Sequence, residues 1–164
     1  MKCLCFSDSH GDSAKIAAVL KMHPDAEVIF YLGDGLSDIE GLMRPDKAWL
    51  AVQGNCDYSS ALGTGFVKKT DSIRILNKKI IFTHGDLYGV KYGEGGIIKM
   101  ATEHNADLVL FGHTHAPLEK YIPTDDGGFY IFNPGSIGRS FGSKSSYGII
   151  NITEGGIFLS HGLI

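Results

Sequence analysis

The sequence lacks the long apolar stretches that mark membrane and secreted proteins. No apolar run approaches the ~18 residues of a membrane-spanning helix. The run near the N-terminus, Cys3–Phe6, is too short for the core of a signal peptide. These absences predict a cytoplasmic protein that has no membrane partner.

Cysteine and excess positive charge are also scarce. The three cysteines, Cys3, Cys5 and Cys56, do not form a disulfide framework, and the first two lie in an apolar run where they are expected to be small core residues. Lys+Arg number 15 against 18 for Asp+Glu, which gives a net charge of −3. No basic surplus points to a nucleic-acid or membrane surface, although the sequence leaves a nucleic-acid partner and a homo-oligomer open.

What is present fits one soluble globular domain. The chain has 164 residues, of which 43% are hydrophobic, and this length favours a single domain over residues 1–164. The 22 glycines are an unusual count, and they indicate many tight turns or backbone that approaches something closely.

Short apolar runs recur along the first two thirds of the chain. They are near-continuous rather than alternating, which is typical of strands covered on both faces. The five runs are Cys3–Phe6, Val28–Leu32, Ala48–Val52, Ile80–Phe82 and Leu108–Phe111.

Helical patterns lie between some of these runs. Asp12 is a plausible N-cap for a helix over residues 13–22, which Pro24 stops. Ser37 is expected to cap a short helix that continues through Leu42 and Met43 and ends at Pro45. A third apolar stripe predicts a helix within roughly residues 94–104.

The later chain reads as hairpins. Strand patterns flank turns at residues 76–78, 124–127 and 154–155. Units of strand, helix and strand followed by hairpins predict an α/β protein with mixed sheets and helices outside them.

Each of the five apolar runs is followed by residues that can bind a metal, with a glycine beside them. Because ligands gather beyond the carboxyl ends of parallel strands in α/β proteins, these side chains are expected to converge. The candidates are Asp8, His10, Asp34, Asn55, His84, His113 and His115. His23, His104 and His161 lack this context and are expected to be surface or structural residues.

Seven donors are too many for one zinc ion, which takes four ligands in structural sites. Two divalent ions about 3.5–4 Å apart that share one carboxylate ligand would use all seven donors. Imidazole nitrogen together with carboxylate or amide oxygen suits Mn²⁺ as the first choice, and Ni²⁺, iron or Zn²⁺ as alternatives.

The motif series is similar to that of the calcineurin-like metallophosphoesterase superfamily. That family has Asp-x-His, Gly-Asp, Gly-Asn-x-(Asp/Glu), a histidine in a glycine-rich turn and Gly-His-x-His, and all five occur here in order between residues 8 and 136. The small size, Gly-Asn-Cys-Asp at 54–57 and Asn-Pro-Gly-Ser at 133–136 resemble its small single-domain prokaryotic phosphodiesterase branch. The resemblance implies a four-layer α/β/β/α sandwich of two mixed sheets flanked by helices.

The resemblance also implies a function and a set of roles. The expected enzyme is a phosphodiester hydrolase in which a hydroxide bridging two divalent ions attacks a small-molecule diester in line. One metal would take Asp8, His10, Asp34 and His115, and the other would take Asp34, Asn55, His84 and His113. Asp34, Asn55 and His84 are the expected catalytic centre of this set.

Four further residues are candidates for supporting the metals or contacting substrate: Cys56, Asp57, Ser136 and Arg139. Cys56 stands where many superfamily members have a histidine that protonates the leaving group, and a thiol beside two dications is expected to be a poor acid. Each has a simpler interpretation: space filling for Cys56, a loop carboxylate for Asp57, a tight turn around Ser136 and a surface position for Arg139.

Two other functions stay open at the level of sequence. A non-catalytic scaffold of the same fold, like the retromer subunit that resembles this family, would be expected to lose ligands, and none is missing here. A phosphomonoesterase or nuclease would use the same metals, but Cys56 and the absence of a basic surplus argue against both.

Overall fold

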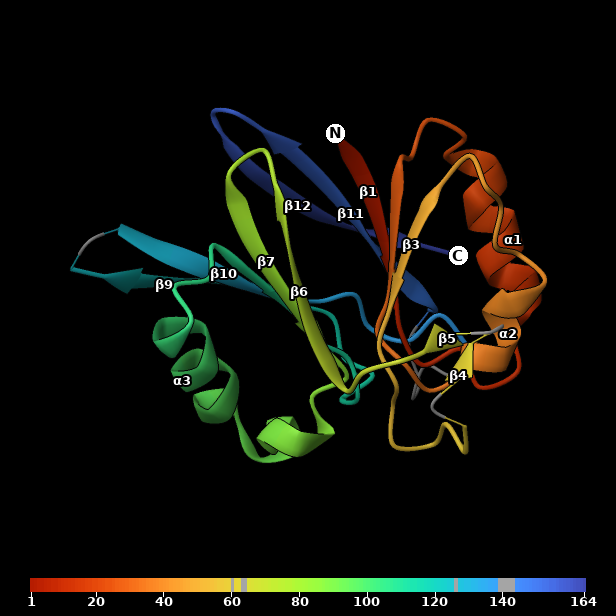
Figure 1. The fold of residues 1–164 in the computed structure, drawn as a ribbon, viewed down its shortest axis with the longest axis horizontal. Coiled ribbons are helices and arrows are strands. Elements are labelled where there is room, and N and C mark those ends of the chain that lie inside the picture. The colour runs from red at the N-terminus through yellow and green to blue at the C-terminus, as the bar shows by residue number, and fades with distance from the viewer. Residues whose placement is uncertain (60, 63–64, 126, 139–143) are drawn as a thin grey trace.

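The computed structural model describes residues 1–59, 61–62, 65–125, 127–138 and 144–164. Two five-stranded sheets dominate it (Figure 1). The first has the order β12-β11-β1-β2-β3, built from Gly156–Leu163, Ser146–Thr153, Lys2–Phe6, Val28–Tyr31 and Ala48–Ala51. The second has the order β6-β7-β8-β10-β9, built from Thr70–Ile75, Lys78–Thr83, Leu108–Leu110, Gly127–Asn133 and Leu118–Thr124.

Both sheets are mixed. Strands β1, β2 and β3 run parallel, and β11 and β12 join them antiparallel. In the second sheet β7, β8 and β10 run parallel, with β6 and β9 antiparallel at the two edges. Each sheet therefore has a central set of parallel strands whose carboxyl ends can carry ligands.

The helices cover the outer faces of the sheets. Helices α1 (Ser13–Met22) and α2 (Leu36–Glu40) lie outside the first sheet, and α3 (Gly95–Glu103) lies outside the second (Figure 1). Two short 3₁₀ helices, η1 (Asp86–Tyr88) and η2 (Val90–Tyr92), precede α3. This is the four-layer α/β/β/α arrangement that the resemblance implied.

The strand β1 shows why the apolar runs are continuous. Cys3 and Cys5 belong to the core between the two sheets, whereas Leu4 and Phe6 belong to the core under α1 and α2. All four are completely buried, and burial raises the pKa of the Cys3 thiol to about 12. The two N-terminal cysteines are therefore core residues, as predicted.

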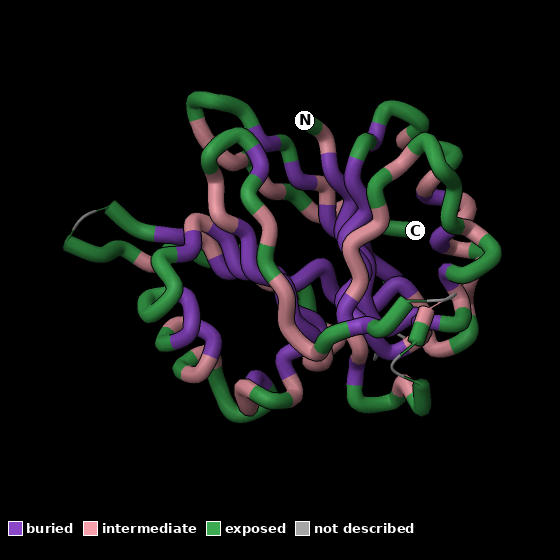
Figure 2. Tube along the Cα trace, viewed as in Figure 1, coloured by how far each residue is buried: buried purple, intermediate pink, exposed green. Residues whose placement is uncertain are grey.

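The sheets pack against each other through large apolar side chains. The rings of Phe30 on β2 and Phe82 on β7 meet edge to face, with centroids 5.4 Å apart. Figure 2 shows buried residues concentrated in the strands between the outer helices. This packing fixes the relative position of the loops that leave the two sheets.

Two of the three predicted helices are confirmed. Helix α1 covers Ser13–Met22, and Asp12 caps it by accepting a hydrogen bond from the Lys15 backbone N–H (3.2 Å). Helix α3 falls within the expected range. The three predicted hairpins correspond to β6–β7, β9–β10 and β11–β12.

The prediction for the second helix was wrong at both ends. Helix α2 begins at Leu36 with Gly35 as its N-cap, so Ser37 lies inside its first turn. The helix ends at Glu40, before Leu42, Met43 and Pro45. The cap is supplied from elsewhere in the chain, because Asp57 Oδ1 accepts the backbone N–H groups of Gly35 and Leu36.

Sequence reasoning also missed the small hairpin of β4 (Ala61–Leu62) and β5 (Gly65–Phe66), and the two 3₁₀ helices. Strands of two residues are too short to show a period. Within the described residues, no helix is long and apolar enough to cross a bilayer.

Candidate metal centre

The seven predicted ligands lie in loops at the carboxyl ends of strands from both sheets. Asp8 and His10 follow β1, Asp34 follows β2 and Asn55 follows β3, all in the first sheet. His84 follows β7, and His113 and His115 follow β8, in the second sheet. The packing of the two sheets brings these loops together.

Most of these residues have an unusual backbone conformation. A positive φ in the left-handed region is costly for a residue with a side chain and tends to occur at functional sites. Five of the predicted ligands have it: Asp8 (56°), His10 (45°), Asp34 (60°), His113 (68°) and His115 (59°). These strained positions therefore coincide with the predicted ligands in three of the loops that follow the strands.

One group of donors consists of Asp8, His10 and His115. His115 Nε2 lies 3.1 Å from Asp8 Oδ1 and 3.4 Å from His10 Nε2. His10 Nε2 lies 3.9 Å from Asp8 Oδ1. These atoms are close enough to share one cation.

A second group consists of Asp34, His84 and His113, with Asn55 beside them. His84 Nε2 lies 3.0 Å from both Asn55 Oδ1 and His113 Nδ1, and 3.4 Å from Asp34 Oδ2. A single ring nitrogen cannot hydrogen-bond three partners at once, so this crowding of donors around one point fits a cation.

The tautomer of His84 also fits a ligand. His84 Nδ1 donates to the backbone carbonyl of Leu32 (2.8 Å), which leaves the Nε2 lone pair directed at the group just described. Burial opposes the charged form of His84, but the nearby carboxylates of Asp34 and Asp8 outweigh it and raise the His84 pKa. Burial and the His84 charge lower the pKa of His113.

Asp34 lies between the two groups. Its ligand atoms are within reach of His84 and His113 on one side and of His10 and Cys56 on the other. Burial raises the pKa of Asp34, yet its pairing with His84 and the hydrogen bond from the Cys56 backbone N–H (2.7 Å) hold that pKa well below the usual range. A buried carboxylate that stays ionised is a suitable shared ligand.

Asp8 gives the clearest local test of whether the residues fit a metal. Its Oδ2 accepts hydrogen bonds from Ser7 Oγ (2.5 Å) and the His113 backbone N–H (3.1 Å). Its Oδ1 is buried and accepts no hydrogen bond from any described residue. A buried carboxylate oxygen without a hydrogen bond, facing two imidazoles, is the arrangement that a divalent cation satisfies.

Asp57 supports the centre through the backbone. Its Oδ2 accepts from the N–H groups of Asp34 (2.9 Å) and Gly54 (2.8 Å), while Oδ1 accepts from Gly35 and Leu36. One carboxylate thus fixes the turn that holds Asp34. Both of its oxygens are used in this way, so Asp57 holds the loop that carries a ligand.

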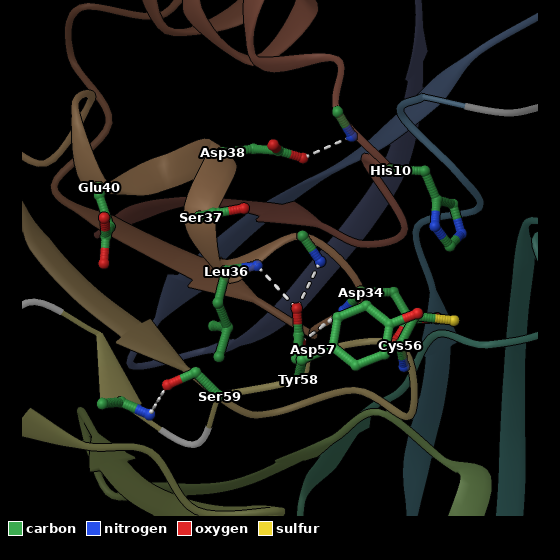
Figure 3. A pocket seen from close by; sticks show the side chains of 13 residues that line it. His10, Asp34, Leu36, Ser37, Asp38, Glu40, Cys56, Asp57, Tyr58 and Ser59 are labelled. Atoms are coloured by element: carbon green, nitrogen blue, oxygen red, sulfur yellow. Dashed lines mark hydrogen bonds between the residues drawn. The ribbon is translucent and has the colours of Figure 1, made fainter.

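A cleft of about 460 Å³ opens beside His10 and Asp34 (Figure 3). Its other described lining residues are Gly11, Gly35, Leu36, Ser37, Asp38, Glu40, Cys56, Asp57, Tyr58, Ser59 and Ala61. None of the described lining residues is a lysine or arginine, and Tyr58 is fully exposed. The cleft could take an organic group attached to a phosphate held by the metals.

Cys56 lies on this cleft and is exposed, and its Sγ accepts a hydrogen bond from Asn55 Nδ2 (3.3 Å). Partial burial, together with the nearby Asp34 carboxylate, raises the pKa of the thiol. Ser136, in contrast, is 1% exposed, and its hydroxyl donates to the backbone carbonyl of Asp8 (2.8 Å). Arg139 lies outside the described residues.

Sequence reasoning missed two features of the site. Ser7, which bonds Asp8, and Tyr58, at the cleft, stand at positions that no spacing rule singles out. The three histidines without a ligand context are surface or structural residues, as predicted. His23 pairs with the Tyr147 hydroxyl (3.0 Å), His161 Nε2 donates to the Asn133 carbonyl (2.7 Å), and His104 is exposed.

The fold and the donor set define a class of protein, the metal-dependent phosphoesterases built as α/β/β/α sandwiches. Residues 1–155 match the model of the calcineurin-like phosphoesterase superfamily domain, and the chain belongs to this family.

Individual relatives agree with this assignment. The chain is 32% identical over 137 residues to the probable metallophosphoesterase YsnB of Bacillus subtilis, covering 84% of this chain and 75% of that protein. A predicted phosphoesterase of Streptococcus pneumoniae superposes with a TM-score of 0.74 at 25% identity, covering 99% of this chain and 88% of that one. Vps29 of Entamoeba histolytica, crystallised with Zn²⁺, has a TM-score of 0.71 at 19% identity and covers 99% of each chain, which shows a shared fold alone.

Proposed function

We propose that the protein is a phosphodiesterase that holds two divalent ions, with Mn²⁺ as the first candidate and Ni²⁺, iron or Zn²⁺ as the others. The observation that carries the proposal is the position of Asp34 at the edge of the cleft, within reach of His84 and His113 of one donor group and of His10 of the other. One ion would be held by Asp8, His10, Asp34 and His115, and the other by Asp34, Asn55, His84 and His113. When bound, the ions supply Lewis-acid activation of water and neutralise charge on the phosphoryl group.

The chain's own residues prepare this chemistry. The His84 Nδ1–H bond to Leu32 keeps Nε2 available as a ligand, and the low pKa of Asp34 keeps its carboxylate ionised. Asp57 fixes the turn around Asp34, so a ligand set already assembled needs little rearrangement to bind metal.

A diester suits the cleft better than a monoester. A monoester carries about two negative charges near neutral pH and a diester only one. Carboxylates line the cleft at Asp38, Glu40 and Asp57, and no lysine or arginine is among its described residues, so the lower charge is repelled less. The cleft also has room for an organic group on the phosphate.

The second candidate is a non-catalytic metal-binding scaffold, which the likeness to Vps29 favours at the level of fold. Such a protein would bind the same ions without turning over a diester. Phosphomonoester and nucleic-acid substrates are further alternatives that the same assay separates.

The test is a metal screen on chelator-treated protein. Mn²⁺, Ni²⁺, Fe²⁺ and Zn²⁺ are added singly, bound metal is measured, and hydrolysis of an aryl diester, an aryl monoester and single-stranded DNA is followed in parallel. We expect about two ions per chain and faster hydrolysis of the aryl diester than of the monoester or the DNA. Two bound ions without turnover would favour the scaffold, and full activity after exhaustive chelation would overturn the proposal.

We also propose that residues 1–164 act as one domain in the cytoplasm on a small-molecule diester. The family model already spans residues 1–155, and the buried thiols of Cys3 and Cys5 are free. A homo-oligomer is compatible with this function and is checked by light scattering.

A further inference from the structure

The chain passes from the second sheet to the first near the metal centre, where β10 ends and the route to β11 begins. Residues 133–138, which we call the connecting segment, form the start of this crossing. Asn133 and Ser136 in this segment are 0% and 1% exposed, so neither can contact a substrate. Their hydrogen bonds show what the segment does instead.

At its first residue the segment holds the loop that carries His113 and His115. Asn133 Nδ2 donates to the backbone carbonyl of Gly112 (2.9 Å) and to Thr114 Oγ1 (3.0 Å). These two partners flank His113, and Thr114 also precedes His115 in the sequence. Asn133 Oδ1 in turn accepts from the Gly135 backbone N–H (2.9 Å), which fixes the orientation of the amide.

At its other end the segment holds the loop that carries Asp8 and His10. Ser136 Oγ and the Gly138 N–H both donate to the backbone carbonyl of Asp8, at 2.8 and 3.2 Å. The Ile137 N–H donates to the carbonyl of Ser7 (3.1 Å). A Cβ at Gly138 would lie 1.8 Å from the Ser9 carbonyl oxygen, so the two backbones are in close contact.

The segment therefore binds two ligand loops that come from different sheets, and it does so through short, buried bonds. The donor group of Asp8, His10 and His115 takes two members from one of these loops and one from the other. The separation of the two loops sets the distance between those ligand atoms. Metal–ligand bonds tolerate errors of only about 0.2 Å, so this separation matters for affinity.

We propose that the connecting segment is a brace that sets the spacing of the Asp8–His10 and His113–His115 loops, with Asn133 and Ser136 as its positioning residues. The inference rests on the proposed metal centre. Partners that orient ligands without touching the metal typically change metal affinity about 10–100-fold when lost. Neither residue reaches the cleft, so the brace acts through metal affinity.

The test compares two buried serines. Ser136 Oγ donates to the carbonyl of Asp8, a ligand residue, and Ser146 Oγ donates to the carbonyl of Pro134, which lies in the connecting segment and in neither ligand loop. Both bonds are 2.8 Å long, and both serines are 1% exposed. Ser136→Ala and Ser146→Ala each remove a buried bond from a hydroxyl to a backbone carbonyl, and only the Ser136 bond reaches a ligand loop.

Dissociation constants for Mn²⁺ are measured by competition with a chromophoric chelator, and melting temperatures are measured without metal. We expect Ser136→Ala to bind the weaker of its ions about tenfold less tightly. Ser146→Ala loosens the segment but breaks no bond to a ligand loop, so it should lose less affinity at a similar loss of melting temperature. Diesterase activity of Ser136→Ala should return when Mn²⁺ is raised. An affinity of Ser136→Ala no lower than that of Ser146→Ala would overturn the brace.

Asn133→Asp is a second variant of nearly the same shape. It keeps an acceptor for the Gly135 N–H but sets a carboxylate oxygen against the Gly112 carbonyl, so Mn²⁺ affinity should fall at least as far as in Ser136→Ala. Unchanged affinity in both Asn133→Asp and Ser136→Ala would leave the brace without support. If the parent protein itself binds no metal, the proposed function fails, and this outcome is distinct from the failure of the brace.

Discussion

At the scale of single residues, Asp34 is the most connected of the proposed ligands. It lies within reach of donors from both sheets, it is 3% exposed, and its pKa is held low by His84 and the Cys56 N–H. The turn that positions it is fixed by Asp57 rather than by its own neighbours. A change at Asp34 should therefore affect both metal positions together.

We expect Asp34→Asn to lose more than the ~100-fold in activity that supporting partners can cost, and to lose part of its bound metal, because the amide has one neutral oxygen to share. Activity on an aryl diester and metal content per chain are the measurements. Asp125→Asn, at an exposed turn beyond β9, is the control and should behave like the parent. Parental turnover in Asp34→Asn would contradict the shared-ligand role.

Cys56 defines a second prediction, on the leaving group. Partial burial and Asp34 raise the pKa of the Cys56 thiol in the metal-free chain, which makes it a weak acid. Two bound dications would instead favour the thiolate, which has no proton to give. Either state gives little help to an alkoxide, which needs a proton as it departs, whereas an aryl oxide does not.

The parent should therefore cleave aryl diesters faster than dialkyl diesters, and Cys56→His should raise the alkyl-to-aryl rate ratio by about tenfold or more, since histidine exchanges protons near neutral pH. The ratio is measured under saturating Mn²⁺, with Cys56→Ala as the control for lost volume. An unchanged ratio in Cys56→His would mean that Cys56 only fills space.

At the scale of elements, the turns after the strands depend on glycines that leave no room for a side chain. A Cβ on Gly54, after β3, would lie 2.1 Å from Asp34 Oδ1 and 2.4 Å from the Asp34 backbone nitrogen. A Cβ on Gly41, at the end of α2, would meet nothing within 4 Å, and its φ is −76°.

We expect Gly54→Ala to displace Asp34, reducing metal content and activity, while Gly41→Ala changes the free energy of unfolding by no more than about 0.5 kcal/mol and leaves activity intact. The measurements are the metal content and the thermal unfolding of Gly54→Ala and Gly41→Ala. Full metal binding by Gly54→Ala would contradict this prediction, because it would show that the turn around Asp34 can shift without loss of metal affinity.

The elements also show where sequence patterns succeed. Helix α1 was predicted because Asp12, its cap, and its apolar stripe are local signals. Helix α2 was misplaced because its N-terminal N–H groups bond to Asp57, which no local rule relates to Gly35. For the site, strand ends and glycines predicted which donors gather, but the distances and the roles of Asn133 and Ser136 depend on how the two sheets pack.

At the scale of the whole molecule, protons and the proposed metal ions compete for the same histidine nitrogens, which lie in loops from both sheets. In the metal-free chain the carboxylates of Asp34 and Asp8 raise the pKa of His84 against the effect of burial. The stabilisation from charged His84 is fully present below its unfolded pKa of about 6.5, and it is lost as pH rises through the raised folded value. Metal binding needs neutral histidines, so it has the opposite dependence on pH.

The gain in melting temperature on adding Mn²⁺ should therefore grow between pH 6 and pH 8, and activity should fall below about pH 6.5. The measurements are thermal unfolding scans with and without Mn²⁺ across this pH range, together with metal content per chain. Activity and metal content that stay level down to pH 5 would exclude histidine ligation.

The order of strands has a consequence for how the chain is made. Strand β1 is synthesised well over a hundred residues before β11, yet Lys2 pairs with Asn151 and Cys5 with Gly148 of that strand. Until then one edge of an apolar strand stands open to any neighbouring nascent chain. A transcript truncated before Ser146 would yield a product prone to aggregation, even though it already contains every donor from Asp8 to His115.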